Sequence, residues 1–264
     1  MISEKDYIEY RKKEIYLLDA LKEICDKHGL VFWIDFGTLL GAVRQKGFIP
    51  WDDDIDVSMP VEDYKKFLKI AEKELPQDIF LQTAKTDKAY KQHFAKLCDC
   101  YSTFLHENET GEESYHQGIY IDIFPSVIYP KMPDFLRKGL LYFTGRSRAK
   151  AVISRENVFF NYSIYLLCKF IWLLLSPFKS DKVAQTVEDN WYYYAIPKSY
   201  IYPLNYIEFE SKLYPAPKKV HEYLSLMYGK DYITPPPPEK RITRAKSILI
   251  STPGNHPRAL QKHG

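Results

Sequence analysis

Apolar and polar residues alternate with a period of two at residues 54–59 and again at residues 119–124. This pattern is typical of β-strands, whose side chains point to opposite faces in turn. In the first strand Asp54 and Asp56 share one face, roughly 6.5 to 7 Å apart along the strand. In the second, Asp122 is the only charged residue, and Pro125 is expected to end the strand. The chain therefore presents carboxylates on two predicted strands.

Apolar residues at helical spacing predict three amphipathic helices: one that ends at His28 and Gly29, one over residues 61–75 and one that ends at Gly229. A shorter helical run is expected at residues 39–43. The other expected elements are strands at residues 31–34, 79–83 and 94–105, strand-like pieces within residues 200–213, a helix at residues 181–194 and an extended proline run at residues 235–238. Both helices and strands are therefore expected.

Residues 131–182 differ in composition from the rest of the chain. They contain ten Lys and Arg residues against three acidic ones, and residues 162–178 are strongly apolar apart from Lys169. This apolar stretch is shorter than the roughly 20 residues that a membrane-spanning helix needs. Two interpretations stay open: a helix buried in the protein core, or an interfacial helix that lies on an anionic membrane surface.

The composition is that of a chain that can bury a substantial core. Of its 264 residues 45% are apolar, and the formal net charge of +3 gives no overall drive toward nucleic acid. Four scattered cysteines do not make a disulfide framework, and the N-terminus lacks an apolar signal-peptide core. We therefore expect a reducing, cytoplasmic location. Cys98 and Cys100 lack the partner pattern of a zinc site and are interpreted as structural thiols.

The candidate chemistry lies between Gly37 and Asp56. Two carboxylates held together without a positive partner repel each other, and a divalent cation removes that repulsion. Mg²⁺, with Mn²⁺ as an alternative, takes one or two protein carboxylates and leaves its other positions to water and phosphate oxygens. Gly37 and Thr38 precede the short helical run and offer backbone N–H groups and a hydroxyl to a phosphate. The alternative interpretation of residues 52–54 is a solvated acidic turn.

Three residues near this turn are candidates for substrate binding. The charges of Arg44 and Lys46 could meet diphosphate oxygens, because a guanidinium binds phosphate in a bidentate fork. Their alternative is a solvated surface pair. Trp51 could stack on a base, face a quaternary ammonium group through a cation–π contact, or pack the turn.

Further candidates lie later in the chain. Lys96 could reach a substrate phosphate or face solvent. Asp122, as a lone carboxylate in an apolar strand, must be paired, hydrogen-bonded or bound to metal. Lys240 and Arg241 follow the proline run, and they could supply positive charge to a phosphate or belong to an exposed tail.

Three longer motifs extend these features: G-T-L-L-G-A-V-R-Q-K-G-F-I-P-W-D-D-D-I-D-V at residues 37–57, G-I-Y-I-D-I-F-P at 118–125 and L-S-L-M-Y-G-K-D-Y-I-T-P-P-P-P-E-K-R at 224–241. They resemble the LicD family, which includes bacterial phosphocholine transferases and, more distantly, fukutin and fukutin-related protein. That family is similar to nucleotidyltransferases, which combine a Gly-Ser or Gly-Thr turn, a D-x-D strand and a third carboxylate on a later strand. The resemblance implies metal-binding and catalytic roles for Asp54, Asp56 and Asp122.

The resemblance implies an α+β fold, with a nucleotidyltransferase-like mixed β-sheet flanked by helices and an inserted basic and apolar helical region. We expect a catalytic core at residues 1–130 and the helical region at residues 131–197, at a membrane surface in the interfacial interpretation. Residues 198–264 are expected to complete the core and to carry a proline-rich tail.

The residue types alone support metal-dependent phosphoryl or nucleotidyl transfer. The resemblance implies transfer of phosphocholine from CDP-choline to a sugar hydroxyl of a teichoic acid or lipopolysaccharide precursor, with release of CMP. CDP-ribitol, CDP-glycerol or CDP-ethanolamine are alternative donors, and a lipid-linked glycan acceptor would favour peripheral membrane contact. Two rivals are a nucleotidyltransferase proper, which would release diphosphate, and a non-catalytic choline- or membrane-binding scaffold, against which the set of three carboxylates argues.

Overall fold

The structure, a computed structural model, describes residues 4–190, 192–241, 243 and 245–251. The chain divides into two compact units. Unit 1 comprises residues 1–123, 207–214 and 235–264, and unit 2 comprises residues 124–206 and 215–234.

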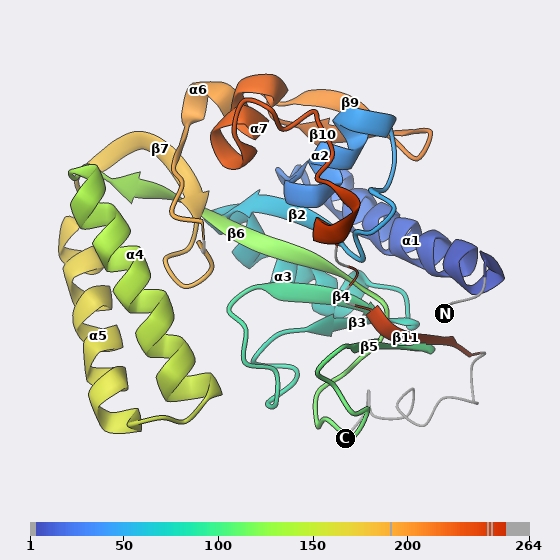
Figure 1. Cartoon of the computed structure of the whole chain (residues 1–264), viewed down its shortest axis with the longest axis horizontal. Helices are drawn as coiled ribbons and strands as arrows, with labels where there is room; N and C mark the ends of the chain where they lie inside the picture. The colour runs from blue at the N-terminus through green and yellow to red at the C-terminus, as the bar shows by residue number, and fades with distance from the viewer. Residues whose placement is uncertain (1–3, 191, 242, 244, 252–264) are drawn as a thin grey trace. The chain divides into compact units, whose positions relative to one another are not determined.

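Unit 1 contains the strands that carry the candidate carboxylates (Figure 1). Its elements are α1 (Glu4–His28), β1 (Trp33–Ile34), α2 (Phe36–Gln45), β2 (Ile55–Pro60), α3 (Val61–Glu74), β3 (Ile79–Gln82), β4 (Ala95–Asp99), β5 (Ser102–His106), the first part of β6 (Tyr120–Pro130), parts of β9 (Asn205–Phe209) and β10 (Lys212–Ala216), the 3₁₀ helix η2 (Pro238–Lys240) and β11 (Ala245–Ile250). Strands β5 and β11 form an antiparallel pair.

The strand order β1-β2-β6-β4-β3 brings together the three strands that carry Asp56, Asp122 and Lys96. Strand β6 lies between β2 and β4, and it pairs with β4 in antiparallel register so that Lys96 is opposite Asp122. The alternation predicted for β2 and β6 is present, because Ile55, Val57 and Ile121 are fully buried while the acidic residues between them point the other way. The sheet therefore positions carboxylates from two adjacent strands on one face.

Two helices of unit 1 meet at their C-terminal ends. Lys27 and His28 at the end of α1 pair with Glu74 at the end of α3, at 2.8 and 3.0 Å. Helix α3 covers the predicted range and buries its apolar stripe, including Phe67 and Ala71. Its packing face follows from the helical spacing of these residues.

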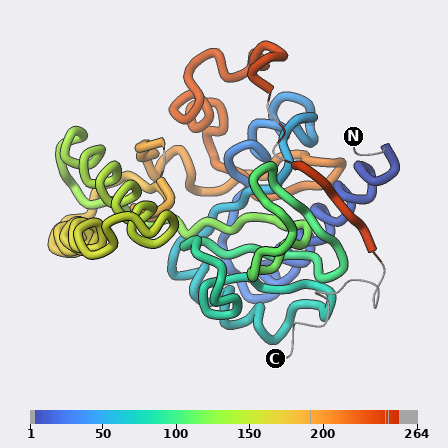
Figure 2. Tube along the Cα trace, turned by 60° about the horizontal axis from the view of Figure 1, so that its bottom comes forward, coloured from blue at the N-terminus to red at the C-terminus, as the bar shows by residue number. Residues whose placement is uncertain are grey.

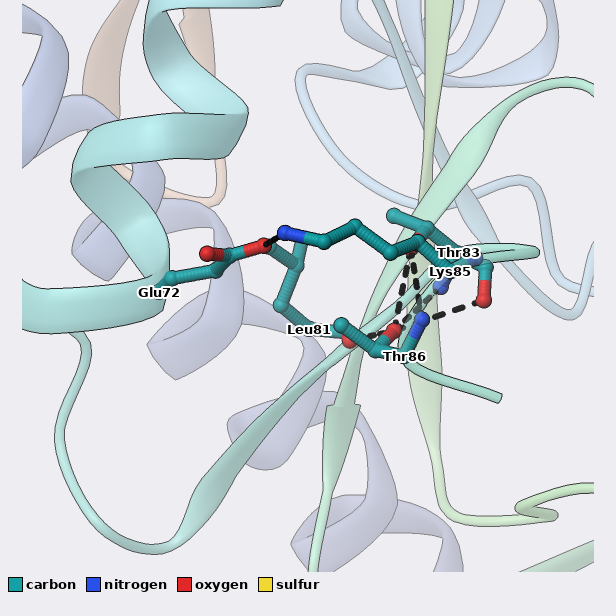
Figure 3. A network of polar contacts seen from close by, with 5 residues as sticks. All are labelled: Glu72, Leu81, Thr83, Lys85 and Thr86. Carbon is teal, nitrogen blue, oxygen red and sulfur yellow. Dashed lines mark hydrogen bonds and ion pairs between the residues drawn. The ribbon is translucent and has the colours of Figure 1, made fainter. Parts of the chain in front are cut away.

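The turn after β3 is tied both to its own strand and to α3 (Figure 3). Thr86 Oγ1 donates a hydrogen bond to the Leu81 carbonyl oxygen at 2.6 Å and accepts one from the Thr83 N–H at 2.9 Å. Lys85 Nζ reaches Glu72 of α3 at 2.9 Å. Threonine hydroxyls thus replace part of the backbone hydrogen bonding where the strand ends.

Unit 2 contains a helical pair and the second half of β6. Its elements are α4 (Asp134–Arg148), the π-helical turn η1 (Ala149–Ile153), α5 (Val158–Leu175), β7 (Lys179–Gln185), β8 (Ile196–Pro197), α6 (Lys198–Ile201) and α7 (Val220–Tyr228). Strand β7 pairs with both β6 and β8 in antiparallel fashion. Helices α4 and α5 lie side by side, as both views show (Figures 1 and 2).

The predicted α+β class, with a sheet flanked by helices, is confirmed, but two strand predictions need correction. Strand β6 does not end at Pro125. Its pairing with β4 ends at Ile123 and its pairing with β7 begins at Ser126, so the missing N–H of proline falls between the two paired stretches. The strand expected at residues 94–105 is two strands, because Asp99 Oδ2 accepts a hydrogen bond from the Tyr101 N–H at 3.1 Å and the chain turns there.

Two helix interpretations were also wrong. Residues 181–194 begin with strand β7, in which Val183 and Ala184 are buried against β6. The apolar stretch is helical, as α5, but it is not a core helix, since 11% of its residues are buried. By length and composition alone α5 could cross a membrane. Residues 252–264 of the expected C-terminal region lie outside the described residues.

The same substitution, glycine to alanine, should have opposite effects on stability at two positions of unit 2, because the backbone conformation differs between them. Gly229, which ends α7, has φ +90° and ψ 169°, and an added Cβ would meet nothing within 4 Å. Because this backbone region is costly for other residues, we expect Gly229→Ala to lower the free energy of unfolding by about 1–3 kcal/mol. Gly139→Ala, inside α4 and equally uncrowded, should raise it by about 0.5–1 kcal/mol. Chemical denaturation of both variants checks the opposite signs, and equal signs would contradict the backbone assignment.

Candidate functional site

The carboxylates of Asp54, Asp56 and Asp122 converge. One oxygen from each lies within 4.8 Å of the others, with Asp122 buried and both Asp54, just before β2, and Asp56, in β2, half-buried. Asp52 and Asp53 form a second such group with Asp54, so the acidic cluster continues into the loop before β2. The structure thus brings Asp122 of β6 together with Asp54 and Asp56, which are 68 and 66 positions earlier in the chain, rather than placing residues 52–54 in an isolated solvated turn.

Lys96 of β4 supplies a positive charge to this cluster. Its Nζ lies 2.7 Å from Asp122 Oδ1, and both side chains are largely buried. The same ammonium lies 3.2 Å from the centroid of the Tyr120 ring, in a cation–π contact. The Tyr120 hydroxyl in turn contacts His106 Nε2 at 3.1 Å. Of the two alternatives for Lys96, the one in which it faces solvent is therefore wrong.

The remaining negative charge changes the proton affinity of the cluster. Burial, and then the charges of Asp52 and Asp122, raise the pKa of Asp54 well above its usual range. Burial and the charges of Asp54 and Asp122 do the same to the pKa of Asp56. Burial also raises the pKa of Asp122, although the Lys96 ammonium opposes this shift. An added positive charge would therefore stabilise the ionised forms of the three carboxylates.

The geometry of these oxygens fits a divalent cation. In an octahedral Mg²⁺ site, adjacent ligand oxygens are about 2.9 Å apart and opposite ones about 4.2 Å apart, given a metal–oxygen distance of about 2.1 Å. Carboxylate oxygens within 4.8 Å of one another can reach these separations by small side-chain rotations. Asp54, Asp56 and Asp122 are accordingly the residues that could hold such an ion.

Helix α2 fixes the position of Asp56. The Asp56 N–H donates to Thr38 Oγ1 at 2.8 Å, and the Asp56 carbonyl accepts from the Asp35 N–H at 2.9 Å. Asp35 is the N-cap of α2: its Oδ1 accepts from the Phe36 N–H at 2.8 Å, and its Oδ2 accepts from Ser58 Oγ at 2.6 Å. Sequence reasoning missed Asp35 and Ser58, although an aspartate just before a helical run is a typical N-cap.

The Gly-Thr pair lies inside the first turn of α2 instead of in a loop before it. A Cβ added to Gly37 would lie 2.0 Å from Asp52 Oδ2, so the Asp52 side chain packs directly on this glycine. Glycine allows this close approach of the acidic loop to the helix N-terminus, because a Cβ here would force the Asp52 carboxylate to move. The backbone N–H groups of that turn, which attract anions, are thus next to the acidic cluster.

The basic candidates are placed in different ways. Lys46 caps the C-terminal end of α2, opposite the end that holds Asp56, and pairs with Glu208 at 2.7 Å. Arg44 lies in the last turn of the same helix, half-buried. The structure therefore does not bring Lys46 to the carboxylates, and it keeps Arg44 about two helical turns from Gly37.

Trp51 and Arg241 contact each other. The Arg241 guanidinium lies 4.6 Å from the centroid of the Trp51 ring, and Arg241 Nε donates to the Pro236 carbonyl at 2.9 Å. The proline run thus brings Arg241 beside the residue that precedes the acidic loop. Lys240, its neighbour in η2, is exposed.

Two residues of α1 bind backbone carbonyls of the acidic loop. Sequence reasoning missed both of them. Tyr10 donates its hydroxyl to the Asp53 carbonyl, and Arg11 donates to the Asp52 carbonyl. Glu14, fully buried, pairs with Arg11 at 2.7 Å. Their spacing relative to Leu18 and Leu21 places them on the buried face of α1, which was the available signal.

Cys98 and Cys100 do not join a metal cluster among the described residues, whose candidate clusters consist of aspartates. Both thiols are buried, and Cys98 donates to Gln82 Oε1 at 3.5 Å. Burial raises the pKa of the Cys98 thiol, which keeps it protonated. This arrangement agrees with structural thiols.

Two hollows lie near these elements. A cavity of about 40 Å³ is lined by Lys96, Tyr120 and His106, too small for a nucleotide. A groove of about 620 Å³ is lined by α1 residues such as Tyr16, and none of the three carboxylates lines it. Asp54 and Asp56 are half-buried, so part of each side chain is accessible to solvent.

Comparison with known proteins gives matches over the same region. The family model described as LicD/FKTN/FKRP, nucleotidyltransferase domain, matches residues 29–159, which include Asp54, Asp56 and Asp122. The lipopolysaccharide cholinephosphotransferase LicD of Haemophilus influenzae is 30% identical over 243 residues, 84% of this chain and 89% of that protein. Human ribitol-5-phosphate transferase FKTN is 34% identical over 64 residues, 24% of this chain and 14% of that protein. An uncharacterised Rickettsia typhi protein is 33% identical over 142 residues, 52% of this chain and 40% of that protein.

Thr38 offers a test of how the D-x-D strand is held. Thr38→Val keeps the side-chain shape but removes the acceptor of the Asp56 N–H, so we expect the free energy of unfolding to fall by about 1–3 kcal/mol. Thr38→Ser keeps the hydroxyl and should retain most of the stability. Urea denaturation of both variants makes the comparison. A valine variant as stable as the serine variant would show that this hydrogen bond is not needed.

Proposed function

The chain belongs to the LicD family of proteins with a nucleotidyltransferase domain, and from this premise we propose that it is a Mg²⁺-dependent phosphotransferase. In the proposed reaction, phosphocholine moves from CDP-choline to a sugar hydroxyl of a teichoic acid or lipopolysaccharide precursor, and CMP is released. The observation that carries the proposal is the convergence of Asp54, Asp56 and Asp122. The choice of choline is supported by the similarity to the Haemophilus cholinephosphotransferase.

The proposed reaction is a displacement at phosphorus. The acceptor hydroxyl oxygen forms a bond to the phosphorus that carries choline, the bond from that phosphorus to the bridging oxygen breaks, and the bridging electron pair leaves with CMP. The hydroxyl proton must pass to a base. Asp122 is proposed either as that base or as a further metal ligand, and its raised pKa suits proton acceptance better than that of an ordinary carboxylate.

Asp54 and Asp56, with Asp122, would hold Mg²⁺ in the proposed site; Mn²⁺ would fit the same oxygens. The bound ion would offset negative charge on the transferred phosphoryl group and on the leaving group. Lys96 keeps Asp122 in place through the 2.7 Å ion pair. The fixed backbone of Asp56 then limits how far the carboxylates can move during the reaction.

The phosphate-binding roles are proposed for the groups nearest the cluster. The first turn of α2, with Gly37 and Thr38, offers N–H groups and a hydroxyl. Arg241 and Trp51 lie against each other just before the acidic loop, where the guanidinium would bind a phosphate of the donor and the ring would contact its base or choline. Arg44 is proposed for the same diphosphate, whereas Lys46 and Lys240 have no contact that supports such a role.

The proposed location is the cytoplasm, at the cytoplasmic face of the membrane when the glycan acceptor is lipid-linked. The four cysteines are free thiols in the structure, which suits a reducing compartment. A lipid-linked acceptor would make membrane contact useful to the reaction.

A second donor is favoured by one comparison. The human relative is named as a ribitol-5-phosphate transferase, so CDP-ribitol is the alternative donor that deserves direct comparison with CDP-choline, along with CDP-glycerol. A nucleotidyltransferase proper is the other rival, and it would release diphosphate instead of CMP.

The main test incubates the purified protein with Mg²⁺, a panel of CDP-alcohols and candidate glycan acceptors, and measures CMP release. We expect CMP from CDP-choline, and we expect Asp56→Asn and Asp122→Asn each to reduce the rate at least a hundredfold, because loss of one preorganised charge at a reacting centre costs about that much. Asp181→Asn is the matched control: Asp181 is exposed in β7, and the variant should turn over normally. Absence of CMP with every cytidine donor, or diphosphate as the product, would refute the proposal.

A thermal shift assay tests metal binding separately from turnover. The raised pKa values of Asp54 and Asp56 mean that their charged forms lower the free energy of unfolding at neutral pH. We therefore expect Mg²⁺ to raise the melting temperature of the wild type. Asp56→Asn should melt about 2–4 °C higher than the wild type without metal, because it removes repulsion, and should gain less from Mg²⁺. Equal Mg²⁺ shifts in both proteins would place the ion elsewhere.

A further inference from the structure

Helices α4 and α5 expose a set of large apolar side chains in unit 2. We call this set the apolar hairpin face: Phe135 (78% exposed), Phe159 (88%), Phe160 (66%), Phe170 (55%), Leu173 (66%) and Leu174 (57%). Residues 166, 167 and 178 add to it with similar exposure. An exposed apolar surface of this extent on a soluble protein marks an interaction site.

Four polar side chains of α5 have partners within the protein. Lys169 pairs with Glu188 at 2.5 Å, and Tyr165 donates to the same carboxylate at 3.1 Å. Asn161 Nδ2 donates to the Glu156 carbonyl at 2.7 Å, and Ser163 Oγ donates to the Phe159 carbonyl at 2.8 Å. In water, these polar groups could hydrogen-bond to solvent and would not need partners within the protein. Internal satisfaction is what an apolar solvent demands, because an unpaired polar group there costs several kcal/mol.

Basic residues flank the apolar hairpin face at both ends. Arg146 and Arg155 lie by the turn that joins α4 to α5. Lys131 and Lys179 lie where the pair begins and ends, and the Lys131 N–H donates to the Phe178 carbonyl there. Among the described residues, these four cations have no carboxylate within 4.0 Å. They are thus available to anions.

We propose that the apolar hairpin face docks on an anionic phospholipid membrane and lies within its interface, parallel to the surface. Cations that flank an exposed apolar helix face match anionic headgroups around acyl chains. A second copy of the chain fits less well, since residues 131–182 carry ten cations and three acids and two copies would bring like charges together. A spanning arrangement would carry Arg146 and Arg155 across the bilayer, which is costly.

Only the role of this docking rests on the proposed function: it would bring the enzyme to a lipid-linked acceptor. The docking itself needs no donor, metal or acceptor. Vesicle binding and CMP release are therefore separate measurements, and the failure of one leaves the other interpretable.

The test is cosedimentation of the full chain with vesicles of phosphatidylcholine, alone or mixed with phosphatidylglycerol. We expect the wild type to bind the mixed vesicles and to bind less at high salt. The double variant Phe159→Glu/Leu174→Glu should bind at least tenfold more weakly. Leu213→Glu is the matched control, since Leu213 is 61% exposed in β10, outside the helical pair, and it should bind as the wild type does. The triple variant Lys131→Gln/Arg155→Gln/Lys179→Gln should lose the preference for the anionic vesicles.

Three results would overturn the proposal. The first is a wild type that stays in the supernatant with both kinds of vesicle. The second is a double variant that binds as well as the wild type. The third is a wild-type dimer in light scattering that becomes monomeric in the double variant without any vesicle binding, which would assign the face to a second copy. CMP release with a soluble acceptor should be the same in the double variant as in the wild type. Loss of CMP release in the variant alone would indicate that the variant is misfolded.

Discussion

The site depends on one electrostatic constraint, the crowding of buried carboxylates around a limited positive charge. Asp54, Asp56 and Asp122 each have a raised pKa, and the ion pair from Lys96 compensates one of them directly. The strand order places β6 between β2 and β4, so the sheet forces these side chains together. Such an arrangement costs stability unless another cation joins it, and that cost is the physical reason to assign chemistry to the cluster.

The fold holds the cluster against its own repulsion through backbone contacts. Thr38 receives the Asp56 N–H, and Asp35 links the N-terminus of α2 to Ser58 on β2. On the other side, Tyr10 and Arg11 of α1 bind the carbonyls of the acidic loop. In β2 and the acidic loop these contacts engage backbone groups and the Ser58 hydroxyl, so none of them uses the carboxylate of Asp54 or Asp56. A preorganised set of ligands gains more from a bound ion than a mobile one does.

The sequence predicted which residues share a face, but not which strands are neighbours. Alternation around Asp54, Asp56 and Asp122 was sufficient to expect two strands with inward apolar residues. Periodicity gives no register between strands far apart in the chain, so the pairing of Lys96 with Asp122 could not be deduced. Residues 181–194 were misread as a helix because Val183 and Ala184 fit either period, and pairing with β6 decided the outcome.

A net charge of +3 describes neither of the two charged regions of this protein. The acidic cluster belongs to unit 1 and the basic residues 131–182 belong to unit 2, and at physiological ionic strength each charge acts mainly on groups within about 8 Å of it. A charged group that approaches either region responds to the local charge there. The near-neutral total gave no reason to expect nucleic acid, yet it also averaged away both charged regions. For a chain of this kind, charge must be counted by segment, because each partner samples only the segment that it approaches.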